Sequence, residues 1–282
     1  MRKVSYKIII DSCGELPEEL KQDSHFESVP LTLRVDDFEM IDDSTFDQKL
    51  FLKKVAESPN VPKSACPSPE AYMKACQTDA EDVFIVTLSA KLSGSYNSAV
   101  LGRELYLEEA GEKNIYVVNS RSASVGQTLI GKKAAELEEA GYSFSEVVKR
   151  IEQFTDEMRT YFVLESLETL RKAGRLSNLK AFVAGKLQIK PLMGSDPEGG
   201  IVQLATGRGM KKTLDLLVNY AIDHTQNQKE KILAISHCNC PERAAQVKER
   251  FEQMGEFKEI MVLNTAGVST LYAGDGGIIV TV

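Results

Sequence analysis

The feature that most constrains the fold is an alternation of short apolar runs with amphipathic segments through the first half of the chain. The apolar runs lie at 7–12, 83–89 and 115–121. Helical periodicity lies at 45–57, 69–80 and 94–110. Short apolar runs separated by helices are typical of parallel strands joined by crossover connections. The first half is therefore predicted to be a doubly wound α/β domain with a mostly parallel sheet.

The second half has a different pattern. A helix predicted over 124–140 ends at Gly141, and a helix opening at Ser143 or Ser145 is expected to bridge two domains. Strands are then predicted at 161–166, 187–193, 199–205, 231–237, 259–264 and 277–282, and helices at 167–173, 178–185, 210–224 and 241–254. The turn SDPEGG between two of these strands predicts a hairpin, which introduces antiparallel pairing.

The length of the chain favours two domains, because 282 residues exceed the size at which one core usually stops growing. We expect an N-terminal α/β domain over 1–157 and a C-terminal mixed α/β domain over 158–282. The change of pattern alone sets this boundary.

Charge and composition exclude several classes of protein. The formal net charge is −7 and the basic residues form no dense run, which argues against a nucleic-acid partner. No apolar run approaches the ~20 residues that span a bilayer, and the start shows no signal-type region, so a cytoplasmic protein is expected. The 5 cysteines are an odd number, and reduced thiols are expected.

Neither a metal nor a cofactor is predicted. His237, Cys238 and Cys240 lie together, but this spacing lacks the second pair that zinc sites have, and a strand end running into a helix is preferred. The glycines of 272–277 and the serines of 89–95 match neither a Walker motif nor a dinucleotide fingerprint.

Polar residues follow several predicted strands at the edge where α/β proteins bind ligands. These clusters are Asp11-Ser12, 89–95, 119–121 and 63–72. A serine nucleophile would need a histidine within reach, yet His25 and His224 lie in polar surroundings, His237 lies in the other half, and no G-x-S-x-G elbow is present.

Two uses of these serines therefore remain open. Ser64, Ser89 and the amide of Ala90 could hold a carboxylate through neutral donors at a helix start. Alternatively the serines only cap helices, with Ser93 or Ser95 at the start of 94–110 and Ser68 at the start of 69–80.

Taken together, the clusters resemble the DegV family along nearly the whole chain. The matching stretches are IDSCGEL (10–16), VPL (29–31), SACPSP (64–69), SAKLSGSY (89–96), LRKAGRLS (170–177) and LQIKPL (187–192). The resemblance implies a two-domain fold with a long-chain fatty acid in an apolar tunnel between the domains. It also implies a carrier without catalytic residues that presents the acid to a separate fatty acid kinase and that touches membrane surfaces transiently.

The resemblance also assigns roles to particular residues. Ser64 and Ser89 would donate to the fatty acid carboxylate, while Arg175 and Arg208 match family arginines that could meet the kinase or the acyl-phosphate. Tyr272 stands where the family has a histidine. A phenol can donate a hydrogen bond but stays uncharged near neutral pH, so Tyr272 either preserves binding, changes the headgroup preference, or only packs between domains.

Two other functions stay open on the sequence. A transferase or hydrolase could act at the same serines, or the protein could be a sensor in which a ligand closes the two domains. A carrier should co-purify with an acyl chain and show no turnover alone, whereas an enzyme should convert its substrate.

Overall fold

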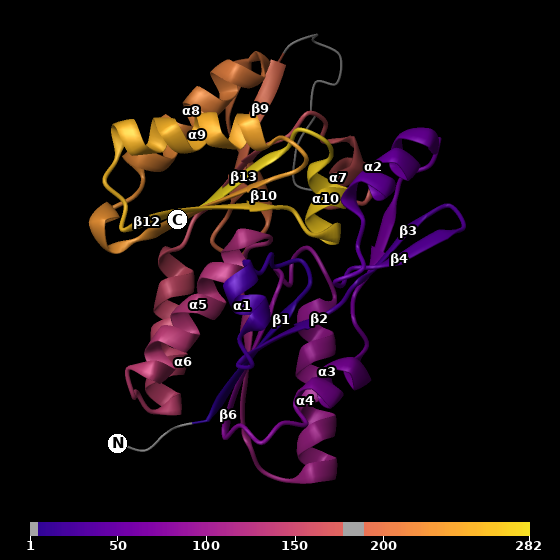
Figure 1. Cartoon of the computed structure of the whole chain (residues 1–282), viewed down its shortest axis with the longest axis vertical. Coiled ribbons are helices and arrows are strands. Elements are labelled where there is room, and N and C mark those ends of the chain that lie inside the picture. Colours follow the sequence, from indigo (N-terminus) through magenta and orange to yellow (C-terminus); the bar gives the residue numbers. More distant parts are fainter. Residues whose placement is uncertain (1–4, 177–188) are drawn as a thin grey trace.

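The computed structural model describes residues 5–176 and 189–282. The helix expected at 178–185 lies outside the described residues. The predicted α/β architecture is confirmed, with a parallel sheet in the first half of the chain and a mixed sheet in the second (Figure 1).

The first sheet has the strand order β2-β1-β6-β7, and all of its pairings are parallel. Its strands are β1 (Tyr6–Asp11), β2 (Phe26–Val29), β6 (Asp82–Thr87) and β7 (Asn114–Asn119). Helices α3 (Pro69–Ala75) and α4 (Ser95–Ala110) cover one face, and α1 (Glu18–Gln22), α5 (Val125–Glu139) and α6 (Phe144–Glu157) cover the other (Figure 1). Helices on both faces explain why the strands have nearly continuous apolar sequences.

Alternate side chains of the parallel strands enter two cores. Ile8 and Ile10 pack toward α5 and α6, where Ile130 is fully buried. Ile9 and Ile85 pack toward α3 and α4 on the opposite face. Because successive strand residues point to opposite faces, one short run fills both layers.

The second sheet has the order β10-β9-β8-β13-β11-β12. Its strands are β8 (Thr160–Val163), β9 (Ile189–Ser195), β10 (Ile201–Arg208), β11 (Ile232–His237), β12 (Glu259–Asn264) and β13 (Ile278–Thr281). The pairing of β11 with β12 is parallel, and the other described pairings are antiparallel. Helices α8 (Gly209–Asp223) and α9 (Pro241–Met254) cover one face (Figure 1). A short 3-10 helix, η1 (Gln228–Glu230), lies between α8 and β11 in the sequence. The other face turns toward the parallel sheet.

The predicted hairpin is confirmed between β9 and β10. Ser195 pairs with Ile201, and one carboxylate oxygen of Asp196 accepts hydrogen bonds from the amides of Glu198 and Gly200 at 2.9 and 2.8 Å. Gly199 has a φ of 86°, a conformation that glycine adopts without strain. The Asp-Pro-Glu-Gly-Gly sequence therefore forms the predicted turn, because Asp196 accepts the turn amides and Gly199 adopts a positive φ.

A small antiparallel sheet was not predicted. It has the order β4-β3-β5, from β3 (Thr32–Val35), β4 (Phe38–Ile41) and β5 (Lys63–Ala65). Strands of 3 or 4 residues are too short to show a clear periodicity. Helices α2 (Gln48–Glu57), α7 (Glu168–Lys172) and α10 (Gly267–Ala273) lie beside it, near the junction of the two large sheets (Figure 1).

The predicted helix caps are confirmed in part. The Ser68 hydroxyl accepts the amide of Ala71 at the start of α3, and Ser143 forms a capping box with Glu146 at the start of α6. Ser95 does not cap α4, because the N-cap is Gly94 and the Ser95 hydroxyl donates instead to Asp11. The Ser93 hydroxyl accepts the Ser95 amide at 3.2 Å.

The expected boundary after residue 157 falls in the loop between α6 and β8. Elements from both sides of it share cores, since Val268 of α10 packs with Leu31, Leu33 and Phe51. The division into 1–157 and 158–282 thus remains a prediction. Within the described ranges, no helix is long and apolar enough to cross a membrane.

Candidate functional site

A cavity of about 340 Å³ lies between the carboxyl ends of the parallel strands and the facing surface of the mixed sheet. The loops after β1, β6 and β7 contribute one wall, including Cys13, Leu88 and Ser122. Strands β8, β9, β10 and β13, together with α7 and α10, contribute the other. The cavity therefore occupies the place where open α/β sheets hold ligands.

Much of the cavity lining is apolar. The apolar residues include Leu31, Leu88, Phe162, Leu164, Ile201 and Ile279, which come from both large sheets and the segment before β3. Such a lining favours a ligand that buries hydrocarbon, because each apolar square ångström removed from water contributes about 25 cal/mol.

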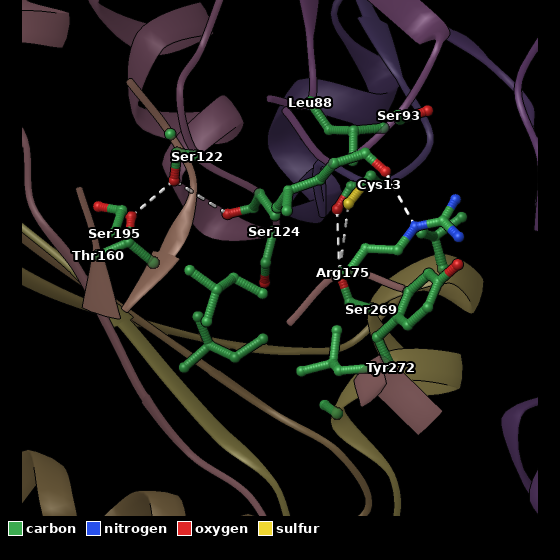
Figure 2. Close-up of a pocket in the computed structure, with 18 of the residues that line it drawn as sticks. Cys13, Leu88, Ser93, Ser122, Ser124, Thr160, Arg175, Ser195, Ser269 and Tyr272 are labelled. Atoms are coloured by element: carbon green, nitrogen blue, oxygen red, sulfur yellow. Dashed lines mark hydrogen bonds between the residues drawn. The ribbon is translucent and has the colours of Figure 1, made fainter. Parts of the chain in front are cut away.

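One end of the cavity carries a cation and hydroxyl groups, and we call Ser64, Ser93, Arg175 and Tyr272 the arginine end. The Ser64 hydroxyl lies 3.1 Å from the Tyr272 hydroxyl. The Arg175 guanidinium carbon lies 5.9 Å from the centre of the Tyr272 ring, and its Nε donates to the Leu92 carbonyl at 3.1 Å. Figure 2 shows the guanidinium between Ser93 and Tyr272. Because arginine stays charged in proteins, this end is suited to an anion.

The opposite end carries neutral hydroxyl groups, and we call Ser122, Thr160 and Ser195 the hydroxyl end. The Ser122 and Thr160 hydroxyl oxygens lie 2.6 Å apart, and the Thr160 hydroxyl oxygen lies 3.2 Å from that of Thr281. Figure 2 shows these three labelled residues grouped away from Arg175 and Tyr272. The cavity thus has two polar ends of different charge.

A buried carboxylate lies behind the cavity wall at the end of β1. Asp11 is fully buried and accepts hydrogen bonds from the Leu88 amide, the Ser95 hydroxyl and the Gln127 side-chain amide at 2.8, 2.7 and 2.8 Å. Burial raises the pKa of Asp11, while these donors oppose the increase. Asp11 thereby ties the loop after β6 to the end of β1.

Two further buried acids hold the start of α10. Asp42 accepts the amides of Gly267 and Val268 at 2.6 and 2.9 Å, and Glu15 accepts the Ala266 amide at 3.3 Å. Burial raises the pKa of Asp42 to about 6 and that of Glu15 to about 7. Because α10 carries Tyr272, these carboxylates position one residue of the arginine end.

The predicted site residues fall into two groups. Ser64, Tyr272 and Arg175 line the cavity, whereas Ser89 and Ala90 are not among its lining residues. The Ser89 hydroxyl is buried and donates to the Gly199 carbonyl at 2.8 Å. The Ala90 amide donates to the Asn119 side chain at 3.1 Å. Both groups are thus engaged in joining loops of the protein.

Arg208 lies at the end of β10, where its side chain is exposed and does not line the cavity. Its expected contact with a kinase stays a prediction. Four further polar residues line the cavity that were not among the predicted site residues, namely Ser93, Ser122, Thr160 and Ser195. Ser93 lies in the SAKLSGSY motif, but its position just before a helix is also typical of a cap.

The three histidines are placed away from the cavity lining in the described structure. His25 contacts the Asp23 carboxylate at 2.7 Å, and His224 contacts the Tyr220 carbonyl at 2.8 Å. His237 ends β11, four residues before α9 begins at Pro241, which confirms the interpretation of that segment as a strand running into a helix. The described lining therefore offers no histidine base to a serine nucleophile.

Known proteins resemble this chain in sequence and in fold. The family model described as "Uncharacterised protein, DegV family" matches residues 5–282. A DegV domain-containing protein of Streptococcus gordonii is 35% identical over 282 residues, covering 98% of each chain. The chain belongs to the DegV family.

Solved structures of the family resemble this chain closely. A DegV family protein from Ruminococcus gnavus, refined with vaccenic acid, is 52% identical with a TM-score of 0.97, over 99% of this chain and 100% of that one. The Fatty Acid Kinase (Fak) B3 protein of Streptococcus pneumoniae, loaded with linoleic acid, is 32% identical with a TM-score of 0.88, over 99% of each chain. DegV-family structures with this fold thus contain fatty acids.

Proposed function

We propose that this protein binds a long-chain fatty acid in the cavity, with the hydrocarbon against the apolar lining and the carboxylate at the arginine end. The observation that carries the proposal is an apolar cavity with a guanidinium and three hydroxyls at one end. The fatty acids bound to the relatives from R. gnavus and S. pneumoniae support it.

The acyl chain and the carboxylate contribute to binding in different ways. Burying the chain contributes about 0.8 kcal/mol per methylene, so a fourteen-carbon tail supplies about 10 kcal/mol before ordering costs. In the Ser64–Tyr272 pair one hydroxyl donates to the other, which leaves one proton for a carboxylate oxygen. Ser93 supplies a further donor, and Arg175 supplies the positive charge that Tyr272 lacks.

Ser89 has a different role in this proposal from that of Ser93. Its hydroxyl would have to leave the Gly199 carbonyl before it could reach a carboxylate. We therefore assign Ser89 to positioning the β9–β10 turn, and Ser93, four residues further along the same loop, to the ligand. Direct contact of Ser89 or the Ala90 amide with the carboxylate is the competing arrangement.

We also propose that the bound acid is presented to a separate fatty acid kinase in the cytoplasm, with this chain acting as carrier. The name of the S. pneumoniae relative, a protein of a fatty acid kinase, supports this role. Arg175 would then face the acyl-phosphate, and the exposed Arg208 would contact the kinase.

Mass spectrometry of the protein tests the binding proposal. Protein purified under native conditions is denatured in organic solvent, and the extract is analysed for lipids. We expect one fatty acid per chain, or uptake of one equivalent by stripped protein. A chain that is empty and takes up no fatty acid would contradict the proposal and favour another ligand.

A coupled assay tests the carrier role. Loaded protein is mixed with ATP and a purified fatty acid kinase catalytic subunit, and any acyl-phosphate is trapped with hydroxylamine. We expect the hydroxamate only when both proteins are present. If this chain forms the hydroxamate with ATP alone, or if it hydrolyses an acyl ester, the protein would instead be an enzyme.

A further inference from the structure

The hydroxyl end of the cavity is more polar than the methyl end of a plain fatty acid requires. Ser122, Thr160 and Ser195 all line the cavity, and Figure 2 shows them together at the side away from Arg175. Ser122 and Thr160 are already buried and bonded to each other, whereas Ser195 is half-buried. A hydrocarbon terminus packed here would take the Ser195 hydroxyl out of water without offering it a hydrogen bond, which is unfavourable.

The hydrogen bonds already present leave capacity for a ligand. Ser122 and Thr160 form a chain with Thr281, and Ser122 also donates to the Ala123 carbonyl at 3.3 Å. Each hydroxyl oxygen in this chain retains an acceptor site. The Ser195 hydroxyl makes no side-chain hydrogen bond within residues 5–176 and 189–282, so both its donor and its acceptor are available.

The charge at this end decides between two kinds of polar ligand group. Arg121 also lines the cavity, but its guanidinium contacts the Asp156 carboxylate at 2.6 Å and the Pro197 carbonyl at 3.4 Å. The charge of Arg121 is thus already balanced by Asp156, and a ligand carboxylate would have to compete with that pair. A neutral hydroxyl, which both donates and accepts, matches Ser122 and Ser195 better.

We propose that the hydroxyl end recognises a hydroxyl group carried toward the methyl end of the acyl chain, so that the substrate class includes hydroxylated fatty acids. This inference rests on the proposed function, because it takes the carboxylate to lie at the arginine end. It names Ser195 and Ser122 as specificity-determining residues.

Paired titrations test the inference. A length series of saturated fatty acids is compared with the same acids carrying a hydroxyl on the terminal carbon, using stripped wild-type protein. At the length that brings the hydroxyl to Ser195, we expect the hydroxylated acid to bind about fivefold more tightly than its plain counterpart. Ser195→Ala and Ser122→Ala should each reduce that ratio toward one.

Ser93→Ala is the matched control, because it removes a hydroxyl from the arginine end. It should weaken both acids of a pair and leave their ratio unchanged. The inference is overturned if plain acids bind as tightly at every length, or if the advantage survives both Ser195→Ala and Ser122→Ala. Failure of every acid to bind would overturn the proposed function itself, whereas binding of plain acids without a hydroxyl advantage would overturn only this inference.

Discussion

Two sets of polar side chains lie at the junction of the two sheets, and they differ in how many of their hydrogen bonds are already made. Asp11, Glu15 and Asp42 lie behind the cavity wall, nearly free of solvent exposure, and each accepts several donors from the protein. Ser93 and Tyr272 line the cavity and have few partners. A polar residue at the end of a strand is thus available to a ligand only when the fold leaves its hydrogen bonds open.

The largest effect is expected when a buried carboxylate, that of Asp11, is removed. Asp11→Ala leaves the Leu88 amide, the Ser95 hydroxyl and the Gln127 amide buried without their acceptor. Each unpaired buried donor costs about 1–3 kcal/mol, so we expect unfolding to become easier by about 4 kcal/mol in urea denaturation. Asp79→Ala, at an exposed position, is the control. A loss below about 1 kcal/mol would contradict the structural role.

The buried carboxylate of Glu15 should make the stability of the protein depend on pH. Burial raises the pKa of Glu15 from 4.5 to about 7, so the folded state keeps a proton that the unfolded state has released. The stability that Glu15 contributes is therefore greatest below about pH 4.5 and is lost as the pH rises through about 7, by roughly 3 kcal/mol.

Glu15→Gln cannot ionise, so its unfolding free energy relative to the wild type should increase from about pH 5 to about pH 7.5. Urea denaturation at several pH values measures this difference. The exposed Glu19→Gln variant should track the wild type. If the difference in unfolding free energy between Glu15→Gln and the wild type does not change with pH, the pKa of Glu15 is not raised in the folded state.

A substitution that disturbs the docking of the β9–β10 turn should have an intermediate effect on stability. A Cβ at Gly199 would lie 2.6 Å from the Arg121 Cα and would also collide with the Ser89 hydroxyl. Gly199→Ala should therefore lower stability by about 2 kcal/mol and weaken fatty acid binding. Gly111→Ala is a matched control, because Gly111 has a φ of 90° with nothing within 4 Å of a Cβ. Equal stability losses and unchanged binding in both variants would mean that the turn does not shape the cavity.

The smallest effects are expected for Ser89 and Ser93, two serines of one loop, and they should differ in kind. Ser93→Ala removes a proposed ligand donor, so affinity for hexadecanoic acid should fall about fivefold with stability nearly unchanged. Ser89→Ala should act mainly on stability, because it removes the hydrogen bond to Gly199. Ser145→Ala, on the exposed face of α6, is the control. The reverse pattern, with Ser89→Ala losing affinity and Ser93→Ala silent, would restore Ser89 as the carboxylate contact.

Much of the fold could be predicted from the sequence because it depends on local signals. The apolar runs of β1, β6 and β7 and the Asp-Pro-Glu-Gly-Gly turn each identify their own structure. The strands of the small sheet could not be predicted in this way, because 3 or 4 residues do not establish a period.

The site was less predictable, because it depends on contacts between distant segments. Ser64 and Tyr272 are 208 residues apart, and only the resemblance to the DegV family suggested that they meet. Sequence spacing also could not separate Ser89 from Ser93. The turn of the loop after β6 directs one serine to Gly199 and leaves the other beside the cavity.

The orientation of the bound acid shows whether the carboxylate lies at the arginine end. We would determine a crystal structure with a saturated fatty acid brominated at its terminal carbon, so that anomalous scattering locates the tail. We expect the carboxylate within hydrogen-bonding distance of Ser93 and Tyr272, near Arg175, with the bromine beside Ser122 and Ser195. A carboxylate at Ser122 and Ser195, or bromine density beside Arg175, would contradict it.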